Sequence, residues 1–153
     1  MKDALEIKII TSNADDTEAI ARKISKKLLG GEVIELKSDL GGGKTTFTRG
    51  FVGALSTDHV TSPSFTISNE YRTPSFEIVH YDFYRLNEAG LIKQALEEKI
   101  HDSRSVVIIE WADLIRDVLP KKRLTITFTV IDEQKRELNL SLPLSLKYLI
   151  EDL

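Results

Sequence analysis

The chain has 153 residues, 41% of them hydrophobic and 29% charged, a composition that favours a folded protein and excludes an intrinsically disordered one. Its 21 Lys and Arg against 24 Asp and Glu leave a net charge of −3, so a large nucleic-acid surface is not expected. Because the chain has no cysteine, disulfide bonds and thiolate metal sites are excluded.

Length and hydropathy predict one soluble, cytoplasmic domain over residues 1–153. A chain of this length has the commonest single-domain size. The first ten residues, MKDALEIKII, contain two acidic residues and no continuous apolar core, unlike a secretory signal. The longest uninterrupted apolar run, Val106–Ile109, is too short to cross a bilayer. The absence of cysteine fits a reducing compartment.

Two segments before the first pair of glycines carry secondary-structure patterns. Glu6–Ile10 is rich in isoleucine and predicts a short strand. Ser12 followed by Asp15 predicts a capping box that opens a helix. The apolar residues of this helix recur at helical spacing: Ile20, Ala21, Ile24 and Leu28. Gly30 and Gly31 are typical of a helix end, so we expect the helix to stop there.

A strand, a glycine-rich loop and a helix follow one another in the next part of the chain. Glu32–Lys37 is a short β-prone stretch that leads directly into the glycines. From Lys44 to Leu55 the apolar residues recur at helical spacing, although Gly50 and Gly53 weaken that helix by roughly 1 kcal/mol each. This is the order of elements in which phosphate-binding loops occur.

The second half of the chain alternates predicted strands with helices. We expect two strands joined by a turn, an exposed helix, a strand buried on both faces, an antiparallel hairpin and a final short helix. In that order they cover Phe65–Tyr71, Phe76–Tyr84, Asn87–Lys99, Ser105–Ile109, Leu124–Val130 paired with Leu138–Leu142, and the residues after Pro143. These elements predict an α/β fold with one mixed parallel and antiparallel sheet.

The segment Ser38–Gly50, SDLGGGKTTFTRG, begins with seven of the eight positions of the phosphate-loop pattern G-x-x-x-x-G-K-[ST]. Small residues let backbone amides converge on phosphate oxygens, and the following helix adds the positive end of its dipole. Lys44 is then expected at the β- and γ-phosphates, and the Thr45 hydroxyl on Mg²⁺. A surface turn that happens to contain Gly-Lys-Thr is the alternative. Ser38 replaces the first glycine, and we expect this small residue to be tolerated.

Two carboxylates end β-prone stretches and are candidates for the rest of the site. Glu110 follows Val106–Ile109, as the magnesium-holding acid of a phosphate-loop protein follows a buried strand. The alternative for Glu110 is a solvated strand end. Asp82 could orient the attacking water or Mg²⁺, or it could form an ion pair with Arg85.

Four segments, SDLGGGKTTFTRG, SPSFTISNEY, HYDFYRL and IIEW, together resemble the TsaE (YjeE) family of bacterial ATPases in their order and separation. They span Ser38–Trp111, about half of the chain. The resemblance implies a P-loop NTPase-like three-layer α/β domain that binds and hydrolyses ATP with Mg²⁺. It also implies action with the TsaB and TsaD subunits in making N6-threonylcarbamoyladenosine on tRNAs that read ANN codons. Contact with tRNA would be indirect, through that complex, and no contact with a membrane is implied.

The resemblance also assigns roles to residues. ATP binding falls on Gly41, Gly42, Gly43, Lys44, Thr45 and Thr46. Magnesium falls on Thr45 and Glu110, and the catalytic roles fall on Lys44, Asp82 and Glu110. Trp111 matches a tryptophan that follows the magnesium ligand, and Ser62–Thr66 matches a switch-like loop near the γ-phosphate. The sequence departs from the family pattern at Ser38 (glycine), Gly42 (alanine), Ser64 (threonine) and Ala112 (proline).

Other polar residues carry weaker signals. The three histidines are too scattered for a metal site, so we expect surface or structural roles for His59, His80 and His101. Lys121–Arg123 is expected to be the solvated start of a strand rather than a contact with tRNA phosphates. No pattern marks an arginine finger among Arg49, Arg72 and Arg85. We therefore expect weak intrinsic hydrolysis that a partner stimulates.

Three functions are compatible with these patterns. The first is an ATPase whose hydrolysis drives or resets a tRNA-modifying assembly. The second is a small-molecule kinase, which would need an acceptor pocket and usually an arginine-rich lid, and the sequence has no such stretch. The third is a nucleotide-gated binding subunit with little turnover, which the sequence separates poorly from the first. The preference for ATP over GTP rests on the family resemblance.

Overall fold

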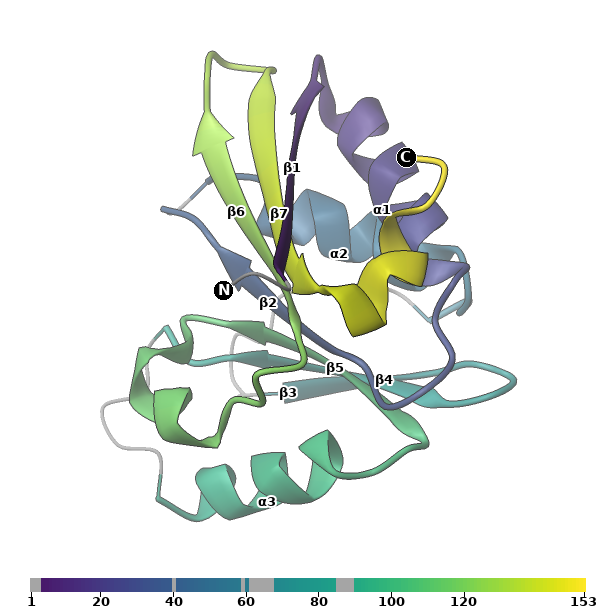
Figure 1. The fold of residues 1–153 in the computed structure, drawn as a ribbon, viewed down its shortest axis with the longest axis vertical. Helices are drawn as coiled ribbons and strands as arrows, with labels where there is room; N and C mark the ends of the chain where they lie inside the picture. The colour runs from purple at the N-terminus through teal and green to yellow at the C-terminus, as the bar shows by residue number, and fades with distance from the viewer. Residues whose placement is uncertain (1–3, 40, 59, 61–67, 85–89) are drawn as a thin grey trace.

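The computed structural model describes residues 4–39, 41–58, 60, 68–84 and 90–153 (Figure 1). Seven strands form one sheet: β1 Ala4–Thr11, β2 Val33–Lys37, β3 Ser68–Arg72, β4 Glu77–Asp82, β5 Ser105–Glu110, β6 Leu124–Val130 and β7 Arg136–Pro143. The helices in the described ranges are α1 Ala14–Ser25, α2 Lys44–Gly53, α3 Gly90–Ile100 and the 3-10 helices η1 Ala112–Val118 and η2 Leu144–Ile150. The predicted α/β class with a mixed sheet is confirmed.

The sheet places β2, the strand that leads into the glycine loop, near its centre. The strand order is β1-β7-β6-β2-β5-β4-β3. β2 is parallel to both of its neighbours, β5 and β6, and β4 is parallel to β5. β1, β7 and β6 are paired antiparallel, as are β3 and β4, so the predicted hairpin of β6 and β7 is confirmed. The carboxyl ends of β2, β4, β5 and β6 therefore meet at one edge of the sheet.

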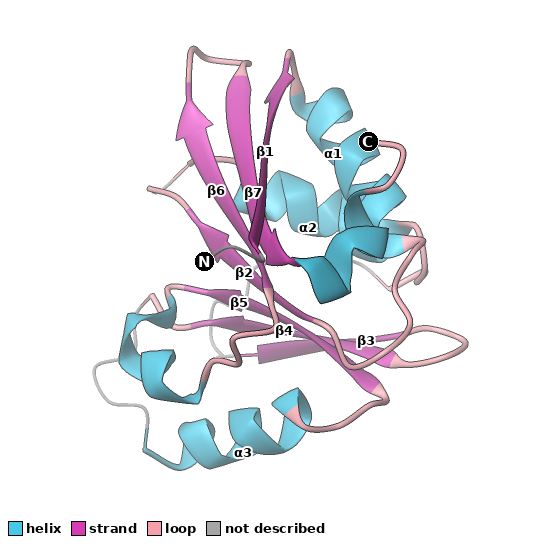
Figure 2. Ribbon diagram, viewed as in Figure 1, coloured by secondary structure: helices cyan, strands magenta, loops and turns pink. Residues whose placement is uncertain are grey.

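Helices cover both faces of the central strands and give three layers (Figure 2). On one face α1, α2 and η2 pack on a core in which the Phe47 ring lies 5.8 Å from the rings of both Phe51 and Phe128. On the other face α3 and η1 bury Leu96 and Ile115 against β4 and β5. Because β5 is covered on both faces, its six residues are all buried. The α3 segment was expected to be exposed, but this was wrong for the side of the helix that carries Leu96 and Ile100, which are buried.

Several element boundaries differ from the sequence expectation. The N-cap of α1 is Asn13, whose Oδ1 accepts from the Asp16 backbone N–H at 2.9 Å, so the predicted cap at Ser12 was one residue early. The helix ends at Ser25, and Leu28 therefore lies beyond it. The expected strand at 65–71 begins at Ser68 in the described ranges, and its residues 65–67 lie outside them, as do residues 87–89 of the expected helix.

Gly50 has a packing role that its helix propensity does not indicate. A Cβ added at this position would lie 2.6 Å from the backbone oxygen of Glu18, so only glycine lets α2 lie this close to α1. Close contact between the two helices offsets the weakness that glycine introduces into α2.

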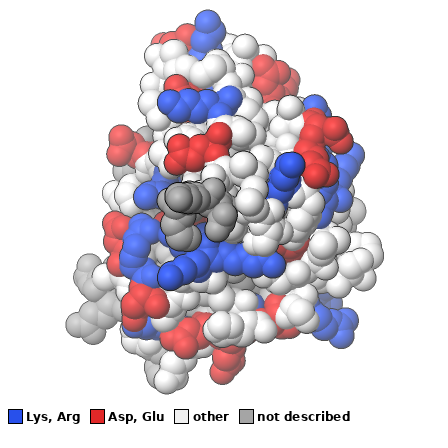
Figure 3. Space-filling model, viewed as in Figure 1, with Lys and Arg blue, Asp and Glu red and all other residues white. Residues whose placement is uncertain are grey.

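Charged side chains of both signs are interspersed over the face seen in Figure 3, with a basic band across its middle.

Arg123, expected to be solvated, instead donates through Nε to Oε1 of the buried Glu35 at 3.1 Å. Arg116 contacts Oε2 of the same carboxylate, also at 3.1 Å. Lys121 and Lys122 are exposed, as expected. In the described part of the chain, no helix combines the length and apolar character that a membrane span needs.

The buried carboxylate of Glu32 fixes the start of β2. Its oxygens accept the backbone N–H groups of Leu29 and Gly30, each at 2.8 Å. Oε2 also accepts the hydroxyl of Tyr148 from η2 at 2.6 Å. Burial, and then this bond to Glu32, raise the pKa of the Tyr148 phenol, which therefore stays the protonated donor. One carboxylate thus joins the C-terminal helix to the segment before β2.

We predict that Tyr148→Phe lowers the free energy of unfolding by about 2 kcal/mol, because it removes a hydrogen bond to a buried charge. Urea denaturation at pH 7 measures this change. Tyr84→Phe is the matched control, since the Tyr84 side chain is 47% exposed and its loss of a hydroxyl should change stability little. Equal effects of the two substitutions would contradict the role assigned to the Glu32 contact.

Candidate functional site

The glycine loop joins β2 to α2 in a shape suited to anions. Gly43 is the N-cap of α2 with φ of 109°, a left-handed conformation that favours glycine. Gly43 has no side chain to cap α2, and the first turn of the helix contains no acidic residue. Its backbone N–H groups and the positive end of the helix dipole are therefore available to a phosphate.

One cavity, of about 290 Å³, gathers all the residues to which the sequence assigns ATP binding, magnesium binding or catalysis. Its lining comes from the loop, from the carboxyl ends of β4 and β5, and from the start of β7: Gly41, Gly42, Gly43, Lys44, Thr45, Thr46, Asp82, Tyr84, Glu110, Trp111 and Arg136. The predicted catalytic, ATP-binding and metal residues are therefore neighbours, and their roles stay predictions.

Strand register brings the two carboxylates of this cavity together. Asp82 pairs with Glu110 across β4 and β5, and Glu110 pairs with Leu36 across β5 and β2. Glu110 thus lies next to both the loop strand and Asp82. Burial raises the pKa of the Asp82 carboxyl, and the negative charge of Glu110 raises it further. The hydrogen bond that Asp82 accepts from the Tyr84 backbone N–H lowers this pKa but does not cancel the increase.

Lys44 is buried, with only 7% of its surface exposed. Its Nζ lies 3.6 Å from Oε1 of Glu110 and 4.0 Å from the ring centroid of Trp111. Among the described residues Nζ has no hydrogen-bond partner. A buried ammonium group without hydrogen bonds is costly, so a ligand that supplies acceptor oxygens here would relieve that cost.

Trp111 links Lys44 to the mouth of the cavity. Its backbone has φ of 56° and ψ of 55°, the left-handed conformation that a bulky residue rarely adopts. Its ring lies 4.9 Å from the ring of Tyr84, at an interplanar angle of 46°. Trp111 therefore contacts Lys44 and Tyr84 at the edge of the core under α3 and η1, at a backbone cost of order 1–3 kcal/mol.

Of the surface or structural roles expected for the histidines, His80 has the structural one. It is only 1% exposed, and its Nε2 contacts Oε2 of Glu110 in a short hydrogen bond. Of the other expected residues, His101 is exposed, and His59, Ser62–Thr66 and Arg85 lie outside the described residues. The pairing of Asp82 with Arg85 therefore stays a prediction.

The donors in the cavity fit Mg²⁺. Thr45 and Glu110 offer hydroxyl and carboxylate oxygens, with the second carboxylate, Asp82, beside them. The described residues contain no group of three or more His, Cys, Asp or Glu arranged to hold a metal. Mg²⁺ usually binds one or two protein oxygens together with substrate phosphates and waters, which is what this set of donors can provide.

Arg136, which sequence reasoning missed, lies at the start of β7 against the loop. Its Nη1 donates to the backbone oxygens of Asp132 and Lys135 at 2.7 and 2.9 Å, and its buried Nε has no hydrogen-bond partner in the described part. The only sequence signal was a basic residue just after the β6–β7 turn. Since β6 is parallel to β2, that turn comes to the same edge as the loop.

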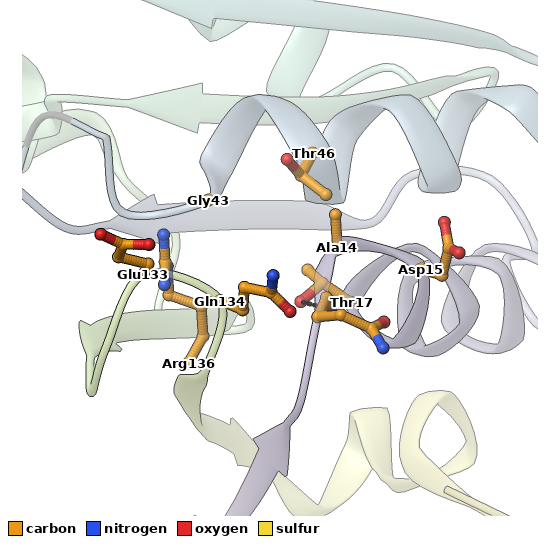
Figure 4. Close-up of a pocket in the computed structure, with 9 residues that line it drawn as sticks. Ala14, Asp15, Thr17, Gly43, Thr46, Glu133, Gln134 and Arg136 are labelled. Atoms are coloured by element: carbon orange, nitrogen blue, oxygen red, sulfur yellow. Dashed lines mark hydrogen bonds between the residues drawn. The ribbon is translucent and has the colours of Figure 1, made fainter.

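A second cavity, of about 350 Å³, continues the first past the loop (Figure 4). Both are lined by Gly43, Thr46 and Arg136. Figure 4 shows Gln134, from the β6–β7 turn, extending toward Ala14 and Thr17 of α1, while the ends of Glu133 and Arg136 lie nearer the loop at Gly43. The two cavities together could take an elongated ligand with its phosphates at the loop.

Ser38 and Gly42, the two departures within the loop, are coupled in space. A Cβ added at Gly42 would lie 2.4 Å from Oγ and 2.5 Å from Cβ of Ser38. The Ser38 hydroxyl donates to the Asp39 backbone oxygen at 2.7 Å, which holds its side chain there. Ser38 therefore occupies the space that an alanine at position 42 would need. Glycine at 42 compensates for serine at 38.

We predict that Gly42→Ala weakens binding of a non-hydrolysable ATP analogue by about 1 kcal/mol, roughly fivefold, because the methyl group clashes with Ser38. In a Ser38→Gly background the same substitution should cost clearly less, since Gly42 does not have positive φ and the Asp39 backbone oxygen, 3.1 Å from the added Cβ, is the remaining close neighbour. Calorimetry of the wild type, both single variants and the double variant measures this coupling. An equal loss from Gly42→Ala in both backgrounds would exclude it.

Comparisons with known proteins agree with this fold and loop. The sequence model of the family described as threonylcarbamoyl adenosine biosynthesis protein TsaE matches residues 11–138. The tRNA threonylcarbamoyladenosine biosynthesis protein TsaE of Bacillus subtilis is 38% identical over 134 residues, which cover 87% of this chain and 84% of that protein. The protein of the same name from a Nostoc species is 33% identical, with 85% and 82% covered.

A solved structure gives the same result in three dimensions. The crystal structure of YdiB from Bacillus subtilis superposes with a TM-score of 0.79 and 33% sequence identity, over 97% of this chain and 94% of that one. By the family match over residues 11–138 and the identity to full relatives, this chain belongs to the TsaE family.

Proposed function

We propose that this chain is the ATP-binding and ATP-hydrolysing subunit of the machinery that makes N6-threonylcarbamoyladenosine on tRNAs reading ANN codons. It would act in the cytoplasm as one P-loop domain over residues 1–153, together with the TsaB and TsaD subunits and without direct tRNA binding. The pathway follows from the names of its relatives. One observation supports the chemistry: the glycine loop, Lys44, Asp82 and Glu110 line a single cavity.

The loop and the helix behind it would bind the phosphates of ATP. Backbone N–H groups of the loop would supply hydrogen bonds, and Lys44 would supply a charge that lies at the cavity already. Thr45 and Glu110 would hold Mg²⁺, which when bound neutralises phosphate charge. The nucleoside would occupy the second cavity, because that cavity shares Gly43, Thr46 and Arg136 with the first.

Asp82 is suited to orient the attacking water. It lies beside Glu110 at the same sheet edge, and its raised pKa makes it a better proton acceptor than an ordinary aspartate. In the described part of the chain, Arg136 is the only arginine that lines the cavity, and its Nη1 is engaged with the β6–β7 turn. We therefore propose that intrinsic hydrolysis is weak and that a partner subunit stimulates it.

We predict that Lys44→Ala reduces affinity for ATP by at least about tenfold, since it removes a charge from the β- and γ-phosphates. Trp111 is the only tryptophan in the sequence, and Lys44 lies against its ring, so its fluorescence should change when the wild type binds ATP. Arg49→Ala, a charge loss on the exposed side of α2, is the control. Unchanged ATP affinity in Lys44→Ala would refute the proposed site.

We predict that wild-type ATP turnover is slow alone and rises when TsaB and TsaD are added. Steady-state phosphate release, with and without the two subunits, measures this. An unchanged rate would exclude partner stimulation. If Glu110→Gln binds ATP, fails to hydrolyse it and still supports repeated rounds of tRNA modification, the chain is a nucleotide-gated binding subunit instead.

We predict a pH dependence of hydrolysis that follows Asp82. Only the ionised carboxylate can accept a proton from water, so kcat/KM should fall as the pH falls through the pKa of Asp82. Because that pKa is raised, the fall should begin at a higher pH than for an ordinary aspartate. The kcat/KM profile of Asp82→Asn should lack this acidic limb, and a limb that persists there would assign it to another group.

A further inference from the structure

The carboxylate of Glu110 is shared between two buried nitrogen groups on opposite sides. Oε2 contacts Nε2 of His80, and Oε1 lies 3.6 Å from Nζ of Lys44. Glu110 and His80 are 3% and 1% exposed, so water does not compete for this contact. Each oxygen therefore has its own partner, and the plane of the carboxylate is fixed by both.

Strand register explains why His80 reaches Glu110. His80 pairs with Ile108 across β4 and β5, and Glu110 comes two residues after Ile108 on the same face of the sheet. The two side chains are thus diagonal neighbours on adjacent strands. Both backbones are paired in the sheet. Glu110 is the last residue of β5, and His80 lies two residues before the end of β4.

The hydrogen bond fixes which nitrogen of His80 carries a proton. A carboxylate oxygen only accepts, so Nε2 must donate. Nδ1, also buried, has no hydrogen-bond partner among the described residues. The side chain is thus arranged to present one donor to Glu110.

The two partners of Glu110 differ in what a bound nucleotide would do to them. In the proposed function Lys44 turns toward the phosphates, which frees Oε1. His80 is not among the residues that line the cavity, because it precedes Asp82, at the end of β4, by two residues. It therefore has no phosphate to turn toward. Its contact with Oε2 would persist and leave Oε1 as the one oxygen directed to the cavity.

We propose that His80 is a positioning residue that holds the Glu110 carboxylate, so that a single oxygen, Oε1, faces the magnesium of a bound nucleotide. This inference rests on the proposed function. Groups that orient a metal-binding side chain commonly change metal affinity by 10–100-fold when they are removed. His80 would therefore set the benefit that Mg²⁺ brings to nucleotide binding, without touching the nucleotide.

Two amide substitutions separate this role from a general need for a polar residue. The amide nitrogen of His80→Gln can occupy the place of Nε2 and donate to Glu110. The amide of His80→Asn is shorter and lies where Nδ1 lies, out of reach of that carboxylate. Both variants are polar and of similar size. His101→Gln, at an exposed histidine, is the control for loss of an imidazole.

The measurement is the affinity of the full chain for a non-hydrolysable ATP analogue, by calorimetry, once in EDTA and once in saturating Mg²⁺. The ratio of the two dissociation constants is the Mg²⁺ gain. We expect His80→Asn to reduce this gain about tenfold while its affinity in EDTA stays that of the wild type. His80→Gln should retain most of the gain, and His101→Gln all of it. In a Glu110→Gln background His80→Asn should cause no further loss.

The outcomes distinguish the failure of this inference from failure of the proposed function. An equal Mg²⁺ gain in wild type and His80→Asn would overturn the role of His80 alone. So would a loss that appears equally in EDTA, a loss in His80→Gln as large as in His80→Asn, or a further loss in the Glu110→Gln background. A wild type that binds no nucleotide, or binds it without any Mg²⁺ gain, would overturn the proposed function and this inference with it.

Discussion

The parallel pairing of β2 with β5 is the constraint on which the site depends. It places the glycine loop and Glu110 side by side, because Leu36 and Glu110 are register partners at the ends of their strands. A slip of one residue in β5 would turn Glu110 to the opposite face of the sheet, toward α3 and η1. The buried run Val106–Ile109 resists such a slip, since its alternate residues fill two different cores.

Three buried carboxylates lie along β2, before its start, in its middle and beside its end, and they have different roles. At its start Glu32 binds two backbone amides and Tyr148, and these bonds are structural. In the middle Glu35 is matched by Arg116 and Arg123. Beyond its end Glu110 has partners on two sides, yet Lys44 Nζ still has no hydrogen-bond acceptor in the described part. Glu32 and Glu35 thus maintain the scaffold, whereas the unpartnered Nζ of Lys44 lies where a ligand is expected.

Sequence reasoning succeeded where the signal is local. The glycine loop between β2 and α2, the strand that ends in Glu110 and the β6–β7 hairpin each follow from a few adjacent residues, and the structure confirms these three elements. Arg136 and His80 were missed because their roles depend on strand pairing between segments far apart in sequence. Ser and Asn are both good N-cap residues, so the sequence alone could not decide between Ser12 and Asn13. The structure shows that Asn13 caps α1. The closeness of Ser38 to Gly42 needed atomic coordinates.

The position of Lys44 between Glu110 and Trp111 also bears on how easily a nucleotide leaves. A buried lysine without other partners would be left with an uncompensated charge when the phosphate departs, and release of the nucleotide would be slow. Here the departing phosphate is replaced by a carboxylate and an aromatic face a few ångströms away. Bound and free forms therefore differ less in energy than the phosphate contacts alone imply. In the proposed function, this alternative contact of Lys44 would favour exchange of nucleotide over tight retention.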